Sequence, residues 1–194
     1  MAMMPQARGI VLLAVALCGL ELLLSGCEGR TNQKRFTPMT TAKNSAEKLW
    51  QRVTVEESYS RYAFWPGHEG IRRAQFPHGS FHRIYINRVL YDTLPSEREL
   101  LPAGSVVVKE QFNGDKKKQS ISVMAKIEGY NPQAGDWFWA SYGLDGRPRV
   151  AGRVAGCIAC HAGLKDNDYI MVRDIGRPVR LEEERARGRR FRED

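Results

Sequence analysis

Apolar and polar residues alternate over several short runs in the second half of the chain, and this period of two is typical of half-buried β-strands. In residues 120–128, Ile121 and Val123 fall on one face of such a strand, and Ser122 and Met124 fall on the other. Turn-forming residues between the runs leave only short connections, which favours antiparallel pairing. The other predicted strands cover residues 82–89, 105–112, 136–142 and 169–172.

Helices are predicted on either side of this strand-rich region. Residues 45–62 place Leu49 and Val53 at helical spacing, and residues 66–79 hold several Gly and Pro that predict a loop. A second, short helix is expected around residues 157–161, near the C-terminus. These elements predict an α+β fold class, which is mainly an antiparallel β-sheet with flanking helices.

The N-terminus has the composition of an export signal. Arg8 precedes an apolar run, residues 10–24, which is too short and too interrupted for a comfortable transmembrane helix. The run ends in Leu-Ser-Gly before Cys27, which resembles the cleavage site of a bacterial lipoprotein. We therefore expect a signal peptide at residues 1–26 and a lipid on Cys27; an ordinary signal peptide with an incidental cysteine is the alternative.

These features predict a periplasmic protein that is anchored to a bacterial membrane by its lipid. Glu28, rather than Asp, follows the cysteine, so nothing indicates retention in the inner membrane, and we expect the outer membrane. Residues 27–42 are polar and typical of a flexible tether, residues 43–178 are expected to form the folded domain, and residues 179–194 a charged tail. The net charge is +8, from 30 basic and 22 acidic residues. Acidic residues are mixed into the basic tail, so we expect a solvated terminus and no nucleic-acid partner.

The segment Cys157-Ile158-Ala159-Cys160-His161 has the C-x-x-C-H spacing of a c-type haem attachment site. On one helical turn, thiols at positions i and i+3 lie on the same face, and the next residue lies alongside. Cys157 and Cys160 are therefore predicted to hold one covalently bound haem c through its vinyl groups. His161 is predicted to bind the haem iron as the metal ligand.

Other uses of the two cysteines have less support in the sequence. A Cys2His2 zinc site would need His78 and His82, but the Gly and Pro beside them argue against a helix there. A disulfide across two intervening residues would be strained, and no βαβ context supports a thioredoxin-like dithiol. The cysteine count agrees with haem attachment, because Cys18 leaves with the signal peptide and Cys27 carries the lipid.

The position of the motif near the end of the chain predicts an open iron site. Met171 follows the motif so closely that it is poorly placed to reach the opposite haem face. An empty sixth position permits ligand binding or chemistry at the iron. The alternative is a six-coordinate electron-transfer cytochrome in which Met171 or Met124 binds iron. His68, His78 and His82 are expected in loops or on the surface rather than at the iron.

Residues 77–172 resemble the cytochrome P-460 family, which includes the cytochromes c′-beta. The matching stretches are residues 82–87, 104–110 and 135–138, and the haem motif followed by Asp168-Tyr169. The resemblance implies a mainly antiparallel β-fold with flanking helices, usually a homodimer, and a five-coordinate haem. It also implies a lysine side chain joined covalently to the porphyrin edge, and the matching residue is Lys109. From the residues alone, a strand lysine is more often solvent-facing.

One departure from the family bears on function. Members that oxidise hydroxylamine use a carboxylate above the iron to remove protons, but the matching position falls near Ile121, in a stretch without a carboxylate. Strand alternation should point Glu110 away from Lys109. An apolar wall instead resembles the c′-beta branch, which binds nitric oxide.

The sequence thus predicts a mono-haem c-type cytochrome of the P-460 type that either oxidises hydroxylamine, passing electrons to a partner cytochrome, or binds nitric oxide. Whether it is an enzyme stays open. The alternatives are a non-catalytic gas-binding protein and a simple electron-transfer cytochrome. Alternation places Trp137 and Trp139 on one strand face and Phe138 on the other, and core packing is expected for all three.

Overall fold

The computed structural model describes residues 42–94 and 100–172. The predicted signal peptide, the lipid-bearing Cys27, the charged tail and nearly all of the predicted tether lie outside these residues. In the part of the chain that is described, no helix is both long and apolar enough to cross a membrane.

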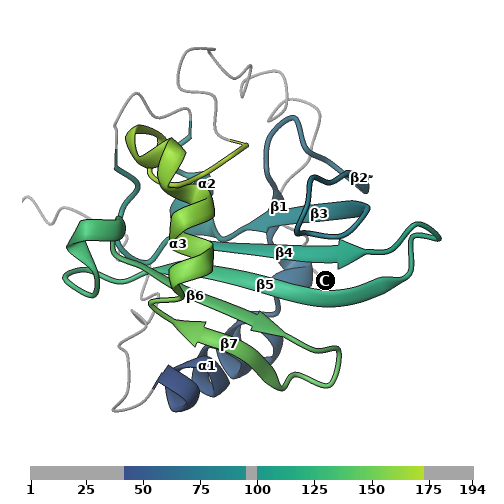
Figure 1. Cartoon of the computed structure of the whole chain (residues 1–194), viewed down its shortest axis with the longest axis horizontal. Helices are drawn as coiled ribbons and strands as arrows, with labels where there is room; N and C mark the ends of the chain where they lie inside the picture. Colours follow the sequence, from purple (N-terminus) through teal and green to yellow (C-terminus); the bar gives the residue numbers. More distant parts are fainter. Residues whose placement is uncertain (1–41, 95–99, 173–194) are drawn as a thin grey trace, which may run out of the picture. The chain divides into compact units, whose positions relative to one another are not determined.

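Within the described residues, seven strands form one antiparallel sheet, which confirms the predicted α+β class (Figure 1). The order is β1-β3-β4-β5-β6-β7, and β2 pairs with β3. Strands β3 to β7 lie beside their sequence neighbours because antiparallel strands can be joined by short connections. The strands are β1 (Ala63–Phe64), β2 (Arg72–Arg73), β3 (Phe81–Ile86), β4 (Val106–Phe112), β5 (Lys118–Lys126), β6 (Trp137–Tyr142) and β7 (Pro148–Gly152).

Helices cover both faces of the sheet. The N-terminal helix α1 (Ala42–Gln51) packs against one face, and α3 (Ala155–His161) crosses the other (Figure 1). This arrangement buries both faces of the central strands. The shorter helical pieces are α2 (Arg88–Tyr91) and the 3₁₀ turns Pro132–Ala134 and Ala162–Asn167.

The predicted helix over residues 45–62 is regular only in its first part. After α1 the chain forms a π-helical turn, Arg52–Glu56, and then a 3₁₀ turn, Tyr59–Arg61. The wider turn is closed by the Glu57 amide, which donates to the Arg52 carbonyl at 2.8 Å. Ser58 then takes a positive φ of 40°, which no helix continues.

Three features of the strands differ from the sequence prediction. Residues 169–172 do not form a strand, because Asp168 and Tyr169 have positive φ values of 54° and 63°. Strand β7 was missed, since its alternation is weak and pairing with β6 defines it. The predicted strand 82–89 ends at Ile86, because the Asn87 side chain caps α2 by accepting from the Leu90 amide at 3.2 Å.

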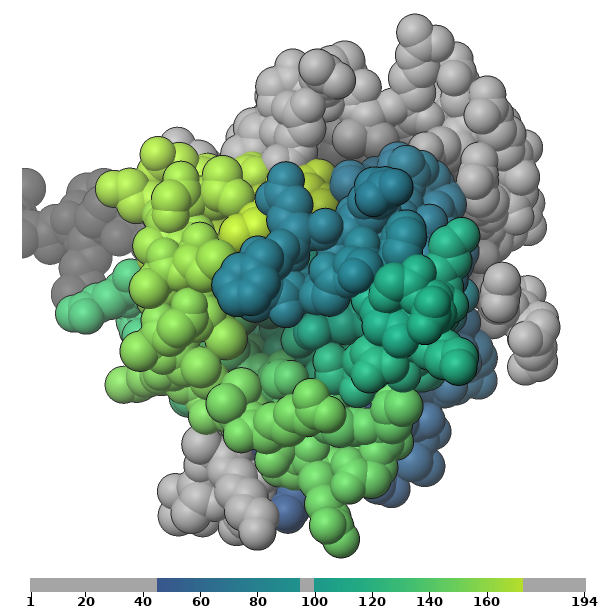
Figure 2. Space-filling view, turned by 45° about the vertical axis from the view of Figure 1, so that its right-hand side comes forward, coloured from purple at the N-terminus to yellow at the C-terminus, as the bar shows by residue number. Residues whose placement is uncertain are grey.

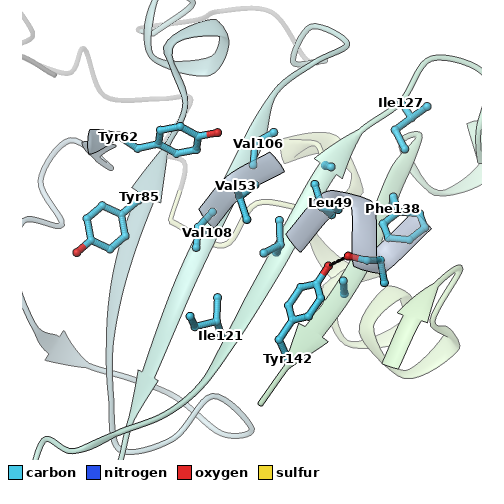
Figure 3. Packing of buried hydrophobic residues seen from close by; sticks show 14 residues of the cluster. Leu49, Val53, Tyr62, Tyr85, Val106, Val108, Ile121, Ile127, Phe138 and Tyr142 are labelled. Carbon is cyan, nitrogen blue, oxygen red and sulfur yellow. Dashed lines mark hydrogen bonds between the residues drawn. The ribbon is translucent and has the colours of Figure 1, made fainter. Parts of the chain in front are cut away.

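The first core fills the space between α1 and the sheet (Figure 3). Leu49 of α1 is fully buried there with the strand residue Val108, and each such side chain contributes about 1.5–3 kcal/mol by leaving water. Tyr142 fixes the helix further, because its hydroxyl donates to the Ala46 carbonyl at 2.8 Å. The helix is therefore held by apolar packing and by one buried hydrogen bond.

The second core lies on the opposite face of the sheet and borders the site described below. Trp137 and Trp139 belong to it while Phe138 belongs to the first core, as the alternation predicts. Beyond this core, the blue loop before β3 and the yellow-green segment around α3 lie on either side of a hollow (Figure 2). The sheet thus separates the first core, which is closed by α1, from the second core, which borders a cavity.

Glu110 is a buried carboxylate on the first-core side of β4, facing away from Lys109 as predicted. It accepts hydrogen bonds from the Tyr59 hydroxyl at 3.0 Å, from Arg83 Nε at 2.7 Å and from Lys118 Nζ at 3.1 Å. Burial alone would raise the pKa of Glu110, but the hydrogen bonds and charges of Arg83 and Lys118 lower it below its usual value. The ionised form is therefore stabilised by folding.

We expect Glu110→Gln to lower the unfolding free energy at neutral pH by about 1–3 kcal/mol, because it removes charged hydrogen bonds. A carboxyl whose pKa is depressed on folding stabilises above its unfolded pKa, near 4.3, and this stability is lost as pH falls through the folded value. The deficit of the variant should therefore shrink toward pH 3, as measured by urea unfolding of the holo-protein. The exposed Glu56→Gln is the control; equal effects of the two variants would contradict the assignment.

Candidate functional site

A cavity of about 160 Å³ lies between the second-core face of the sheet and α3. The walls are mostly apolar and come from three layers: strands β3 to β6, helix α3, and the segment after it. The lining residues that matter below are His78, Lys109, Ser122, Met124, Cys157, Cys160 and His161.

Helix α3 places the two motif cysteines in this cavity. Cys157 and Cys160 are one turn apart on α3, both line the cavity, and both are free thiols in the described chain. Cys157 is half-buried, and burial raises the pKa of its thiol. The pair can therefore react with two substituents on one edge of a bound ring.

His161 ends α3 and is buried at the base of the cavity. Its Nδ1 lies 2.7 Å from the Tyr169 carbonyl oxygen, to which it donates a hydrogen bond, so Nε2 keeps its lone pair. Burial lowers the pKa of His161, which favours the neutral ring that a metal requires. A histidine whose second nitrogen donates to a carbonyl in this way has its orientation fixed for metal binding.

Asp168 holds the Tyr169 carbonyl in place. Its carboxylate is fully buried and pairs with Lys126 Nζ at 2.6 Å, and it also accepts from the Leu101 amide at 2.8 Å. The Trp137 indole N–H donates to the Asp168 carbonyl at 2.9 Å. Asp168 and Tyr169 both have a left-handed backbone, which turns the chain sharply. As a result, the Asp168 side chain faces Lys126 of β5, and the Tyr169 carbonyl faces His161.

Lys109 projects from β4 into the same cavity instead of facing solvent. Burial lowers the pKa of its amine to about 8, so about a tenth of the molecules carry a neutral, nucleophilic Lys109 amine at pH 7. The structure thus brings together Lys109, Cys157, Cys160 and His161, which are distant in sequence.

The residue of β5 that lies beside Lys109 in the cavity is Ser122, whereas the sequence comparison placed this position near Ile121. Ile121 packs in the first core, and its neighbour Ser122 lines the cavity. Ser122 pairs directly with Lys109 across β4 and β5, and its hydroxyl accepts from Gln111 Nε2 at 2.5 Å. Strand alternation carried one residue further would have identified Ser122, because it shares a strand face with Met124.

His78 is a cavity residue that the sequence analysis placed in a loop or on the surface. It does lie in the loop before β3, but its ring centre is 6.2 Å from that of His161, with the ring planes 83° apart. Burial, followed by the charge of Lys109, lowers the pKa of His78 to about 4. The nearby His82 is buried, and neither of its ring nitrogens has a hydrogen-bond partner in the described structure.

The residues present fit a c-type haem. Two free thiols one turn apart, an imidazole with a fixed tautomer and an apolar cavity are suited to supply the attachment, the iron ligand and the dry surroundings that haem needs. The family model for cytochrome P460 matches residues 48–172. The chain belongs to the cytochrome P460 family. A search of curated proteins gave no match.

Membership of the cytochrome P460 family makes this protein a c-type cytochrome of the P460 type and implies a haem c cofactor. In that setting, His161 is placed to bind the iron, and the Tyr169 carbonyl sets its orientation. Met124 and Met171, the candidate sixth ligands of the electron-carrier alternative, both line the cavity, and Met171 is 42% exposed.

We expect Asp168→Asn to destabilise the holo-protein by about 3–5 kcal/mol, because it leaves Lys126 buried without its anion. Asn tolerates the left-handed backbone, so the loss reports the charge and not the turn. Denaturant unfolding measures the loss, and a weakened iron–histidine stretch in the resonance Raman spectrum reports a looser His161. The exposed Asp166→Asn is the matched control, and a variant indistinguishable from it would refute the role of Asp168.

Proposed function

We propose that this cytochrome binds nitric oxide at a haem c that is attached through Cys157 and Cys160 and held by His161. The observation that carries the proposal is the composition of the cavity. Its described lining contains the complete attachment motif and apolar strand residues, but no aspartate or glutamate. An apolar pocket admits a small neutral gas and disfavours anions at the iron.

The missing carboxylate favours ligand binding over turnover of hydroxylamine. Oxidation of hydroxylamine releases protons together with electrons, so a base within hydrogen-bonding reach assists it. The polar group opposite Lys109 is the Ser122 hydroxyl, which is engaged with Gln111 and is a poor base at neutral pH. The buried carboxylate nearest in sequence, Glu110, is held on the other face of β4 by Arg83 and Lys118.

Hydroxylamine oxidation is the second candidate, and Lys109 is the observation that favours it. A lysine joined to the porphyrin edge is the feature that the family resemblance associates with this chemistry, and Lys109 is half-buried in the cavity wall, with a pKa of about 8. In this version, electrons leave through a partner c-type cytochrome. Among the cavity residues, proton transfer would then fall to Lys109 or to a histidine.

The setting proposed for this chemistry is the bacterial periplasm. The segment that ends at Cys27 supports cleavage and lipidation there, and a lipid on that cysteine would anchor the protein to the outer membrane. Attachment of c-type haem after export agrees with this location. We also propose a homodimer, on the strength of the family resemblance.

Titration of the reduced holo-protein with nitric oxide tests the proposal. We expect a stoichiometric change of the haem absorption spectrum, and no catalytic reduction of a one-electron acceptor such as ferricyanide when hydroxylamine is added. Haem-free protein, made as the Cys157→Ala and Cys160→Ala double variant, is the control. Sustained acceptor reduction by hydroxylamine would replace this proposal with the second candidate, and absence of both responses would refute both.

We expect Lys109→Arg to abolish any red-shifted main band in the spectrum of the reduced protein. Arginine keeps the charge and length of the side chain but is always protonated, so it cannot attack the porphyrin edge. The new carbon–nitrogen bond replaces one C–H and one N–H bond, so an oxidant such as dioxygen accepts two electrons. The exposed Lys117→Arg is the control. A red-shifted band that survives in Lys109→Arg would assign the cross-link to another residue.

A further inference from the structure

The cavity side of the sheet becomes more polar with distance from α3. Helix α3 crosses the sheet near the start of β4, and the turn that joins β4 to β5 lies at the far end (Figure 1). The row of paired residues at the near end is apolar and comprises Ile86, Val107, Met124 and Trp139. Cys157 of α3 packs against this part of the second core. The edge of the cavity at which haem is attached is therefore apolar.

The paired residues at the other end of the cavity side are polar. Gln111 follows Val107 by four positions on β4, a distance of about 13 Å at the usual rise of a strand. Its row, which we call the outer row, comprises Arg72, His82, Gln111 and Ser120. Every second residue of a strand and its direct partners share a face, so the outer row lies on the same side of the sheet as Lys109. This row offers hydrogen bonds and positive charge at the edge remote from α3.

His82 is the buried histidine of the outer row. Its side chain is 7% exposed, and its two ring nitrogens make no hydrogen bond to any described residue. It lines an open recess that shares Lys109 and Cys160 with the haem cavity and so continues from it. A buried imidazole N–H without an acceptor is unfavourable. His82 therefore requires an acceptor that the described side chains do not supply.

The charges around His82 favour an anionic acceptor. Burial, followed by the charges of Lys109, His68 and Arg72, lowers the pKa of His82 to about 4. Glu69 lies close to this group, but its carboxylate pairs with Arg72 at 3.6 Å. A carboxylate among these basic side chains would be stabilised by their charges and could accept a hydrogen bond from the imidazole.

We propose that His82 donates a hydrogen bond to a propionate carboxylate of haem c. The vinyl groups, which join the two cysteines, and the propionates lie on opposite edges of the porphyrin. With the vinyl edge held at α3 over the apolar row, the propionate edge lies over the outer row. The propionates are also the carboxylates that haem c carries, so they match the acceptor that His82 requires. This inference rests on the haem of the proposed function, and it leaves the sixth position of the iron open.

A donor at the propionate would act on the iron as well as on the position of the ring. The negative charge of a propionate stabilises ferric iron relative to ferrous iron, and a hydrogen bond withdraws part of that charge. Hydrogen bonding around a haem is one of the means by which a protein sets the reduction potential. His82 would therefore raise the potential and favour the ferrous state, to which nitric oxide binds in the proposed function.

Resonance Raman spectroscopy of the reduced holo-protein tests the proposal through the propionate bending vibration. His82→Phe should move this band to lower frequency and lower the reduction potential, because the hydrogen bond is lost. The amide N–H of Asn or Gln can replace a ring N–H, so one of His82→Asn and His82→Gln should keep the band near its wild-type position. Ile84→Val, which alters packing on the same strand face without removing a polar group, is the matched control.

An unchanged band in His82→Phe overturns the proposal, and so does an equal shift in Ile84→Val. His82→Leu, which has a smaller side chain, takes the place of His82→Phe if that variant does not retain haem. The test is separate from that of the proposed function. A band that responds to His82 in a protein that fails to bind nitric oxide would refute the proposed function alone, and the reverse result would refute the role of His82 alone.

Discussion

The fully buried carboxylate of Asp168 is the constraint on which the site depends. Burying this charge costs several kcal/mol, and the cost is offset only because Lys126, the Leu101 amide and the Trp137 indole all direct donors to this residue. These partners come from three separate parts of the chain. Their meeting point fixes the backbone at Tyr169, whose carbonyl in turn fixes His161. The orientation of His161, the proposed iron ligand, is therefore set by an ion pair outside the residues that line the cavity.

The pleat of the sheet divides the polar groups of β4 between two environments. Lys109 and Glu110 are adjacent in sequence, yet the lysine lies in the apolar cavity while the glutamate lies among Arg83, Lys118 and Tyr59. This separation leaves Lys109 without a carboxylate partner in the cavity, so burial lowers its pKa instead of a counter-ion raising it. The same alternation keeps the Glu110 carboxylate away from the proposed ligand site.

Sequence patterns predicted correctly those features that depend only on residues close together in the chain. The C-x-x-C-H motif spans one helical turn, and the alternation around Phe138 was correct because a strand has a period of two. The turn at Asp168 could not be predicted, because its left-handed backbone is stabilised by Lys126 and Leu101, both distant in sequence. His78 lies in a loop as expected, but its place at the cavity, with its ring centre 6.2 Å from that of His161, could not be predicted because the two residues are distant in sequence.

The two histidines at the cavity are held with unequal strength, which bears on how a ligand reaches the iron. His161 is tied by its helix, by a ring hydrogen bond and, through Tyr169, by a buried ion pair. His78 depends on a few backbone hydrogen bonds of one loop and on the fit of Gly79 against Phe112. Moving His78 disturbs only that loop, whereas moving His161 breaks the buried network.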